Sequence, residues 1–596
     1  MPFNVSDRPM STARLPDRSP KARPAGAGPH GPRTRRKRLT GRALPVVVLA
    51  LAAFAGGAAL GASHEPADRK VATRFVKAWE RRDYGAMYEL LSAATRTDVT
   101  PRRFERAYDR AADTATVESI RAGRLRQAGD GRFEVPVRAE TRRFGTLSGT
   151  VALELDAAGS DLPGVVWERH QVLPGLRAGE RLRRDIDLPA RGTLQARDGQ
   201  VIAQGPERTS DLGPLAAEIA GRVGPIPEAE TERYAELGYP PDAGVGLTGL
   251  ERQFEQRLAG TFGGTLHAGE RVLARTQPRQ AGPVRTSIDP DIEAAASAAL
   301  AGRFGGVAVQ RPRTGEVLAL AGIAYSAPQP PGSVFKIITL AGALDAGIVK
   351  PRQSFPVQTA ATLSGVELEN AHGEACGGSL AAAFAASCNS VFAPLGADLG
   401  ARRLVAAAER FGFNEPDGIV GAPPGSIPAA AEIGDDLAVG STAIGQGRLL
   451  STPLRMAEVA AAIANDGELV RPTLLRGTTG ERSRATSPAT AAVVRRFMRR
   501  VVKQGTGVAA ALPGVRVAGK TGTAELRTTV PEEDVVTPEG TPQPDPQDTT
   551  DTDAWFVAFA PAARPQVAVA VLLVGQGAGG ETAAPVARAV LEAALE

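Results

Sequence analysis

The most informative stretch of this sequence reads Pro331-Gly332-Ser333-Val334-Phe335-Lys336. Proline and glycine end a loop, and Ser333 then opens an apolar helix that we expect to run toward Leu344. Positions i and i+3 share one face of a helix, so Lys336 can lie beneath the Ser333 hydroxyl. A serine hydroxyl is a weak nucleophile that needs a base, and a lysine can serve when burial or a second cation lowers its pKa.

Lysine is scarce in this chain, because only eight of its 70 basic residues are lysines. Arginine does not deprotonate in practice and could not act as the base, so a lysine kept at position 336 favours a chemical role. The pattern Ser-x-x-Lys is a weak signal by itself, since it occurs by chance about once in a few hundred residues at average composition. Further motifs are therefore needed.

Two such motifs follow in the same part of the chain, Ser387-Cys388-Asn389 and Lys520-Thr521-Gly522-Thr523. The first lies in an Ala-rich helical region; a helix cap is its simplest interpretation, but a second hydroxyl can also relay a proton and an amide can bond a substrate. The second reads as an edge strand, either protected by its lysine or built to bind a terminal carboxylate, with room for a substrate backbone at Gly522. In this order, the three motifs indicate serine acyl transfer.

The N-terminal part of the chain predicts a membrane anchor. Residues 1–42 hold eleven Lys/Arg against two Asp/Glu, read as a disordered basic tail, and account for more than the whole net charge of +5. Residues 43–62 form an uncharged run that would span about 30 Å as a helix. The basic residues at 33–38 place the tail inside and everything after residue 63 outside the cytoplasmic membrane. A cleaved signal peptide is the alternative.

The remaining chain is too long for one hydrophobic core and divides into three units. Residues 66–178 combine a helical pattern with strand-like alternation at 133–137 and 149–155, which predicts a small α+β unit. Residues 180–283 are rich in Gly and Pro and read as a spacer or pedestal. Residues 284–596 carry the motifs, and strands near both ends (306–310, 315–320, 555–560 and 567–574) predict one antiparallel sheet assembled from both termini.

With these motifs the chain resembles the class B penicillin-binding proteins. Further segments match that family: Gly445-Gln446-Gly447, Thr452-Pro453-Leu454, Ala464-Asn465-Asp466-Gly467, Ala554-Trp555-Phe556-Val557 and Gly579-Gly580. Residues 66–178 look like the NTF2-like domain of methicillin-resistance-type transpeptidases, and residues 180–283 are similar to the dimerisation or pedestal domain. The segment Gln195-Ala196-Arg197 departs from the family, which usually has an acidic residue before this arginine.

The resemblance implies an α+β multidomain protein whose C-terminal domain has the β-lactamase/D,D-peptidase-like fold, an antiparallel sheet flanked by helices. It implies a D,D-transpeptidase in which Ser333 attacks the D-Ala–D-Ala bond of a peptidoglycan stem peptide and is acylated by β-lactams in the same way. It also implies that Lys336 is the base, Ser387 the proton relay and Asn389 a ligand of a substrate amide. Lys520, Thr521 and Thr523 would hold the substrate carboxylate, and Gly522 would leave room for the substrate backbone on the same strand. The backbone N–H groups of Ser333 and Thr523 would form the oxyanion hole. No cofactor, metal or nucleic acid is implied.

Two features stay open. Cys376 and Cys388 are either two buried thiols or a disulfide, which an extracytoplasmic location would favour. Residues 528–553 contain eight acidic residues, five prolines and no basic residue, so we expect an inserted disordered loop. A solvated hairpin tip is the simpler interpretation of that loop, and a regulatory flap is the other.

Competing functions also remain at this point. A D,D-carboxypeptidase or β-lactamase could share the fold, although no convincing deacylating glutamate follows Asn389. A non-catalytic β-lactam sensor or scaffold could keep it too. A membrane glycosyltransferase is a conceivable partner. A role in elongation, division or sporulation cannot be read from the residues.

Overall fold

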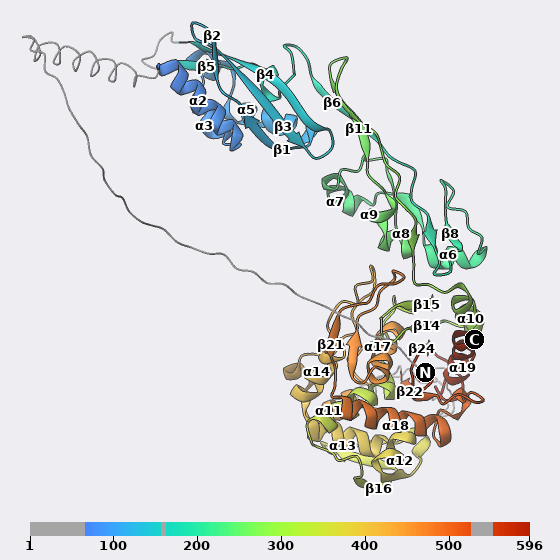
Figure 1. The fold of residues 1–596 in the computed structure, drawn as a ribbon. Helices are drawn as coiled ribbons and strands as arrows, with labels where there is room; N and C mark the ends of the chain where they lie inside the picture. Colours follow the sequence, from blue (N-terminus) through green and yellow to red (C-terminus); the bar gives the residue numbers. More distant parts are fainter. Residues whose placement is uncertain (1–65, 157–162, 526–551) are drawn as a thin grey trace, which may run out of the picture.

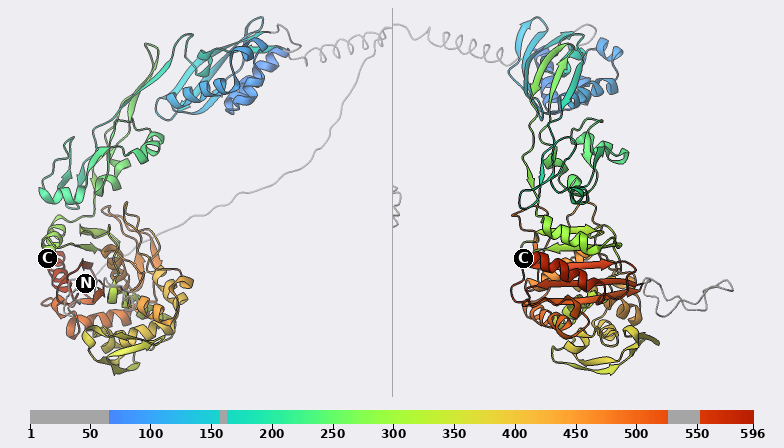
Figure 2. Two further views of the ribbon diagram at one scale, coloured as in Figure 1. Left: turned by 180° about the vertical axis from the view of Figure 1, so that it is seen from behind. Right: turned by 90° about the vertical axis from the view of Figure 1, so that its right-hand side faces the viewer.

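The computed structural model describes residues 66–156, 163–525 and 552–596, which form three units arranged along an elongated molecule (Figures 1 and 2). The predicted basic tail and transmembrane helix lie outside the described residues. Within the three described ranges, no helix has the length and apolar character needed to cross a bilayer.

The N-terminal unit packs helices on a curved antiparallel sheet. Its helices are α2 (Ala67–Glu80), α3 (Tyr84–Glu89), α4 (Ala93–Asp98) and α5 (Pro101–Ala115), and its strands are β1 (Val117–Ala122), β2 (Arg126–Gly129), β3 (Arg132–Thr141), β4 (Gly145–Asp156) and β5 (Gly164–Val166). The strand order is β1-β3-β4-β5, with β2 beside β3. Burial alternates along β3, so one face of the sheet covers Phe75, Trp79 and Phe104 and the other meets solvent. The predicted α+β unit is confirmed.

The middle unit is a bridge of short elements. After η1 (Arg169–Val172), which still packs in the core of the N-terminal unit, the elements of the bridge are β6 (Leu182–Asp187), β7 (Leu194–Gln195), β8 (Val201–Ala203), α6 (Pro214–Ala220), β9 (Val223–Pro225), η2 (Glu228–Glu230), α7 (Thr231–Glu236), β10 (Gly244–Gly246), α8 (Gly249–Gln253), α9 (Glu255–Leu258), β11 (Gly263–Ala268) and β12 (Arg271–Thr276). Strand β11 pairs with both β6 and β12, and its Leu266 packs in the core of the N-terminal unit. At the other end, Leu194 and Leu258 join the large core of the C-terminal unit. The bridge therefore shares its neighbours' cores.

The C-terminal unit is built on a five-stranded antiparallel sheet in the order β15-β14-β24-β23-β22. These strands are β14 (Gly305–Gln310), β15 (Val317–Gly322), β22 (Ala518–Glu525), β23 (Thr552–Ala560) and β24 (Val567–Leu573). Strands from the start and the end of the unit lie side by side, as the sequence predicted. Because every residue of β14 and β24 is buried, helices must cover both faces of the sheet.

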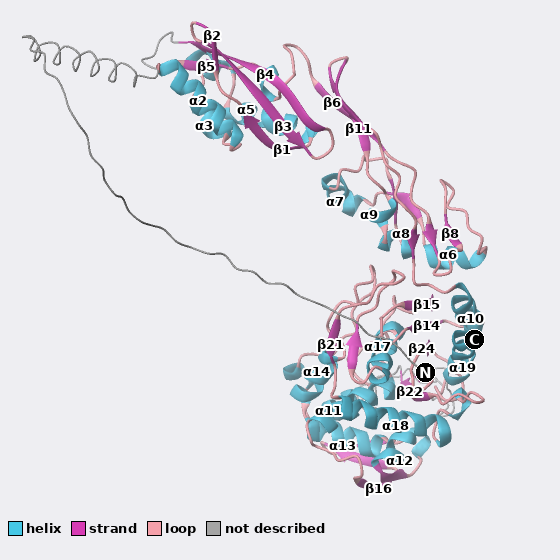
Figure 3. Ribbon diagram, in the orientation of Figure 1, coloured by secondary structure: helices cyan, strands magenta, loops and turns pink. Residues whose placement is uncertain are grey.

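Two helices cover one face, α10 (Pro290–Leu300) and α19 (Ala583–Leu595), and the other face carries α11 (Lys336–Asp345), α17 (Pro453–Ala464) and α18 (Pro488–Gln504). The remaining elements of this unit are β13 (Val284–Arg285), η3 (Gly332–Phe335), β16 (Ser354–Gln358), β17 (Ala360–Leu363), β18 (Val366–Glu369), η4 (Ala371–Gly373), β19 (Cys376–Ser379), α12 (Leu380–Ala385), α13 (Asn389–Leu399), α14 (Ala401–Arg410), α15 (Ala430–Ile433), α16 (Asp436–Ala443), β20 (Glu468–Val470), β21 (Arg482–Arg484) and η5 (Val508–Ala510). Figure 3 shows β16, α12 and α13 at the end furthest from the middle unit.

Two local expectations need correction. Ser333 lies in the short 3-10 turn η3, and the α-helix begins only at Lys336. Ser387, by contrast, lies as expected in a helical region, at the break between α12 and α13, where it has a left-handed φ of 61°. The acidic stretch was expected to be a loop through residue 553, but Thr552 and Asp553 already belong to β23; residues 526–551 lie outside the described ranges.

Candidate active site

The Ser333 loop is held against the edge strand of the sheet. Gly332 has a φ of 56°, and its N–H donates to Gly445 O at 2.9 Å. The indole N–H of Trp555 donates to Pro330 O at 2.8 Å. A Cβ at Gly522 on β22 would lie 2.9 Å from Pro331 O, so glycine is needed there to let the Ser333 loop approach. Gly522 thus leaves room for the Ser333 loop, and its predicted role toward a substrate backbone stays a prediction.

Lys336 is fully buried one turn beyond Ser333 and points into the break between α12 and α13. Its Nζ donates to Ser387 O at 2.7 Å and to Asn389 Oδ1 at 2.6 Å, and lies 3.4 Å from Ser387 Oγ. It also sits 5.8 Å from the centre of the Phe392 ring. The first two motifs are therefore joined through one ammonium or amine group.

Lys520 approaches the same serine from the edge strand. It is fully buried, and its Nζ donates to Ser387 Oγ at 2.7 Å and to Thr521 O at 2.9 Å. The left-handed conformation of Ser387, which is uncommon for a residue with a side chain, presents both its carbonyl and its hydroxyl to the two lysines. Ser387 is the point at which all three motifs meet.

The electrostatics of this site favour neutral lysines. Burial lowers the pKa of Lys336 well below its ordinary value, and the charge of Lys520 lowers it further. Burial lowers the pKa of Lys520 to about 7. No carboxylate of the described residues forms an ion pair with either lysine, so no counter-charge offsets this lowering. A neutral amine at Lys336 can accept a proton from a hydroxyl.

The substrate side of the site is partly open. Ser333 and Thr523 are half-buried, and the Ser333 hydroxyl makes no hydrogen bond to the described part of the chain. Asn389 Nδ2 donates to Glu369 O at 2.7 Å, which leaves one N–H free for a ligand. The hydroxyls of Thr521 and Thr506 are 2.6 Å apart. The structure thus joins Lys336, Ser387, Asn389 and Lys520 through hydrogen bonds. It also holds the Ser333 loop against Gly522 and Thr523 of the edge strand, while the roles of all these residues stay predictions.

Three residues at this site were missed, namely Thr506, Glu369 and Asn370. Thr506 precedes η5, and its hydroxyl contacts that of Thr521. No sequence motif predicts this contact. Glu369 contributes a backbone carbonyl, and any residue type could do that. The Asn370 side chain bonds the backbone of Gln358, Glu374 and Ser390, and no sequence motif predicts these contacts.

Cys376 and Cys388 form a disulfide with a Cα–Cα distance of 5.8 Å. The question left open by the sequence is therefore answered in favour of the bridge. It ties β19 to the N-cap residue of α13, directly between Ser387 and Asn389.

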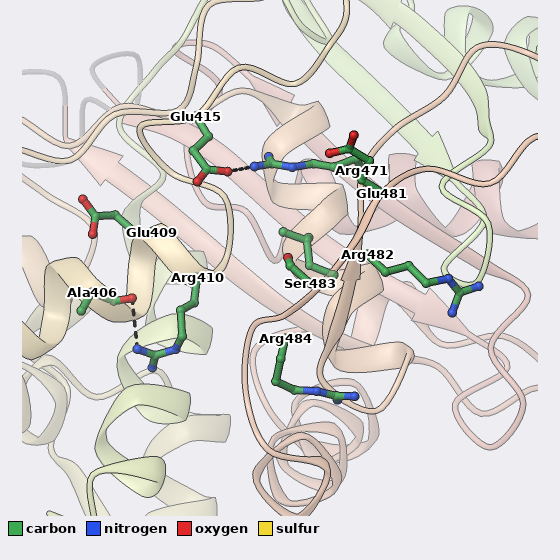
Figure 4. Close-up of a pocket in the computed structure, with 10 residues that line it drawn as sticks. Ala406, Glu409, Arg410, Glu415, Arg471, Glu481, Arg482, Ser483 and Arg484 are labelled. Carbon is green, nitrogen blue, oxygen red and sulfur yellow. Dashed lines mark hydrogen bonds and ion pairs between the residues drawn. The ribbon is translucent and has the colours of Figure 1, made fainter.

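A separate cavity lies elsewhere in the C-terminal unit. It measures about 530 Å³, opens between α14, β20 and β21, and is lined by charged side chains (Figure 4). Its arginines already have partners in the fold: Arg410 with Ala485 O, Arg471 with Glu415, Arg482 with Glu468, and Arg484 with Asp466 O. Within the described residues, no three His, Cys, Asp or Glu side chains gather as metal ligands would. The three-motif site is the stronger candidate.

Family models match most of the described chain. A penicillin binding protein transpeptidase domain matches residues 305–592, a penicillin-binding protein dimerisation domain matches residues 193–272, and an NTF2-like N-terminal transpeptidase domain matches residues 67–180.

Curated relatives and solved structures agree with those matches. The peptidoglycan D,D-transpeptidase PbpA of Mycolicibacterium smegmatis is 33% identical over 505 residues, covering 71% of this chain and 93% of the relative. The PbpA of Mycobacterium tuberculosis is 40% identical over 303 residues, covering 46% and 56%. The M. tuberculosis penicillin-binding protein A, solved as a ceftriaxone acyl-enzyme, is similar with a TM-score of 0.54 at 29% identity, covering 69% of this chain and 99% of that one. Pseudomonas aeruginosa PBP2 in complex with WCK 5153 has a TM-score of 0.58 at 28% identity, covering 69% and 96%.

Proposed function

This chain belongs to the penicillin-binding protein family, and from that membership we propose that it is a peptidoglycan D,D-transpeptidase with Ser333 as its nucleophile. The observation that supports this best is the pair of buried lysines, Lys336 and Lys520, that share the Ser387 hydroxyl without a counter-charge from the described residues. A site built only for stability would pair buried cations with carboxylates. Buried lysines without such partners are suited to proton transfer.

The acylation step begins at the Ser333 hydroxyl. Neutral Lys336 takes the proton as the Ser333 oxygen attacks the carbonyl carbon of the penultimate D-Ala. The backbone N–H groups of Ser333 and Thr523 stabilise the resulting oxyanion. The C–N bond to the terminal D-Ala then breaks. The proton from Lys336 passes through Ser387 to the leaving nitrogen, and D-alanine departs with the proton it needs.

The substrate would be held from both sides. Asn389 has one N–H to spare for a peptide carbonyl of the donor stem. Thr521 and Thr523 supply hydroxyls for its terminal carboxylate, and buried Lys520 contributes positive potential when protonated. The acyl ester on Ser333 then passes to an amine of a second stem, with Lys336 accepting that amine's proton and returning it to the departing Ser333 oxygen. β-Lactams acylate Ser333 in the same way, but their leaving group stays attached.

Labelling with a fluorescent penicillin tests the nucleophile. We expect the unaltered chain to become covalently labelled and Ser333→Ala to lose labelling completely. Ser297→Ala, which removes a hydroxyl on α10 in the same unit, is the matched control and should label normally. Labelling of Ser333→Ala at the normal rate would refute the proposal.

A pair of synthetic stem peptides separates the enzymatic alternatives. A transpeptidase releases D-alanine and forms a cross-linked dimer, whereas a D,D-carboxypeptidase releases D-alanine and forms only the hydrolysed donor. Rapid turnover of the penicilloyl adduct would indicate a β-lactamase. Labelling without D-alanine release would indicate a sensor or scaffold.

We also propose that the protein is a single-pass protein of the cytoplasmic membrane with its N-terminus inside. The uncharged run at 43–62 and the basic residues in front of it support this topology. The disulfide favours an oxidising compartment for the C-terminal unit. Other cell-wall synthesis proteins, such as a membrane glycosyltransferase, are the proposed partners. A protease added to intact cells should digest residues after 63, and full protection would contradict this topology.

A further inference from the structure

We propose that Asn370 is a positioning residue that holds Asn389, and through it Lys336, in the arrangement needed for acylation of Ser333. The inference rests on the proposed transpeptidase function. Asn370 lies outside the three motifs, in the turn between β18 and η4.

The Asn370 side chain joins three separate segments. It is only 5% exposed, and its Nδ2 donates to both Gln358 O and Glu374 O at 2.8 Å. Its Oδ1 accepts from Ser390 N at 2.8 Å. Both donors and one lone pair of the amide are thus used, and no other side chain of this size offers the same set of donors and acceptors. A buried amide with such complete bonding fixes the end of β16, the chain before β19 and the start of α13 relative to one another.

The bond to Ser390 serves as a helix cap. The first N–H groups of an α-helix have no partner inside the helix and need an acceptor from elsewhere. Cys388 is the N-cap residue of α13, but its side chain is in the disulfide and caps no backbone group of the described chain. Asn370 supplies the acceptor that a Ser or Asp cap would normally provide. The first turn of α13, which carries Asn389, therefore depends on a residue from the hairpin.

The neighbouring residue orients Asn389 itself. Glu369 O accepts from Asn389 Nδ2 at 2.7 Å, which turns Asn389 Oδ1 toward Lys336 Nζ, 2.6 Å away. Glu369 and Asn370 are consecutive, so a shift of Asn370 moves the carbonyl that sets this orientation. A displacement of Asn370 would thus change the position of Lys336 through two hydrogen bonds, the one from Asn389 to Glu369 O and the one from Lys336 to Asn389.

A positional change at Asn389 should also be visible in the protonation of Lys336. A hydrogen bond to Asn389 Oδ1 favours the protonated form of Lys336, and the charge of Lys520 on β22 opposes it. Loss of that acceptor lowers the pKa of Lys336 further. The acidic limb of the acylation profile then moves to lower pH, while the maximal rate falls because the amine is misplaced. A residue that only stabilised the fold would not move the limb.

The test measures single-turnover acylation by fluorescent penicillin across pH for the full chain, Asn370→Asp and Asn370→Ala. Rate constants are taken from molecules that become labelled, so partial unfolding does not enter them. Asn370→Asp replaces the Nδ2 amide group, which donates two hydrogen bonds, with a carboxylate oxygen that faces the carbonyls of Gln358 and Glu374. We expect both variants to acylate roughly tenfold more slowly, as for loss of a buried hydrogen-bonded group, with the acidic limb shifted to lower pH. Asn414→Asp makes the same chemical change in a loop after α14 and should behave like the unaltered chain.

A double variant tests the path through Asn389. If Asn370 acts on Lys336 through Asn389, then Asn370→Ala added to Asn389→Ala should cause little further loss. Normal rates and an unmoved limb in the Asn370 variants would overturn the inference, and so would multiplicative losses in the double variant. If the unaltered chain is not labelled at all, the proposed function fails with it. Labelling of the unaltered chain with unaffected variants overturns only the role of Asn370.

Discussion

Two clusters of buried charge in this molecule are built in opposite ways. In the middle unit, Arg191 and Arg208 both donate to buried Glu251, and Arg191 also pairs with Glu255. In the C-terminal unit, Lys336 and Lys520 donate only to neutral oxygens of Ser387, Asn389 and Thr521.

The consequence appears in the protonation of the cations. Burial acts to lower the pKa of Arg191, but the hydrogen bonds and charges of Glu255 and Glu251 outweigh it, so the pKa is raised. Burial alone lowers the pKa of Lys520 to about 7. The bridge thus pairs its buried charges with opposite charges. The candidate active site gives its two lysines no opposite charge, which under the proposed mechanism lets one of them gain and lose a proton.

Removal of the amine at 336 should give the largest effect. We expect Lys336→Met and Lys336→Arg each to slow acylation of Ser333 by about 10²- to 10⁴-fold, the usual contribution of a general base. The arginine keeps the charge but cannot serve as a base, so it distinguishes proton transfer from electrostatics. Unfolding midpoints of Lys336→Met should stay at or above that of the unaltered chain, because a buried cation without a counter-charge costs stability.

Penicillin-labelling rates and thermal melting measure both effects. Lys350→Met, which removes an exposed lysine of the same unit, is the control and should change neither. A strong loss of stability in Lys336→Met with a normal labelling rate would reverse the interpretation of this site.

The pedestal network should show the opposite pattern. Glu251→Gln removes the negative charge that faces Arg191 and Arg208. Breaking such a buried ion pair costs about 3–5 kcal/mol of unfolding free energy. We expect a large drop in the melting temperature of the middle unit and little change in the acylation rate per folded molecule. Glu270→Gln, an exposed carboxylate in the same unit, is the matched control. Unchanged melting of Glu251→Gln would mean that the network contributes little.

The disulfide should contribute less than the pedestal network. A cross-link that closes so short a loop adds roughly 2–3 kcal/mol in the chain-entropy model, so Cys376→Ser combined with Cys388→Ser should lower the unfolding free energy by about that amount. The acylation rate should fall only a few-fold, because the Asn370 bonds still hold α13. Denaturant unfolding with and without reductant measures the first effect. Equal stability in both conditions would show that the bridge is dispensable.

The sequence predicted the active site better than the bridge for a physical reason. The chemistry at Ser333, Lys336 and Lys520 requires particular residue types, and such requirements are visible in a single sequence. The bridge consists of two- to six-residue strands that pair across nearly 80 positions and share their neighbours' cores, as β6 and β11 do. No local hydrophobic periodicity in the sequence predicts such strand pairings.

Within the site, the errors have local causes. Ser333 follows Pro331-Gly332 and precedes an apolar run, so the sequence does not distinguish the 3-10 turn η3 from the first turn of α11. Asn370 and Glu369 act through tertiary contacts, one of them with a backbone carbonyl, so their side-chain identities carried no signal. The cysteine spacing allowed a bridge but could not require one.

For each lysine and each pH unit, the pH dependence of stability should be the smallest of these effects, but it compares the two regions most directly. In the unfolded chain a lysine keeps its proton until about pH 10.4. In the folded chain Lys520 loses it at about pH 7, and the pKa of Lys336 is also well below its ordinary value. Between these limits the unfolded state binds more protons, so stability rises with pH, by at most about 1.4 kcal/mol per pH unit for each lysine.

Arg191, whose pKa is raised, stays protonated in both states and adds nothing to this slope. Urea unfolding of the C-terminal unit between pH 7 and 10 should therefore show a rising stability that becomes shallower in Lys520→Met. Lys503→Met, at an exposed position, should leave the slope unchanged. A slope that is the same in Lys520→Met as in the unaltered chain would mean that Lys520 is charged in the folded state. Its hydrogen bond to Ser387 would then be that of a fixed cation, and Lys336 would carry the proton transfer without help from a second titrating amine.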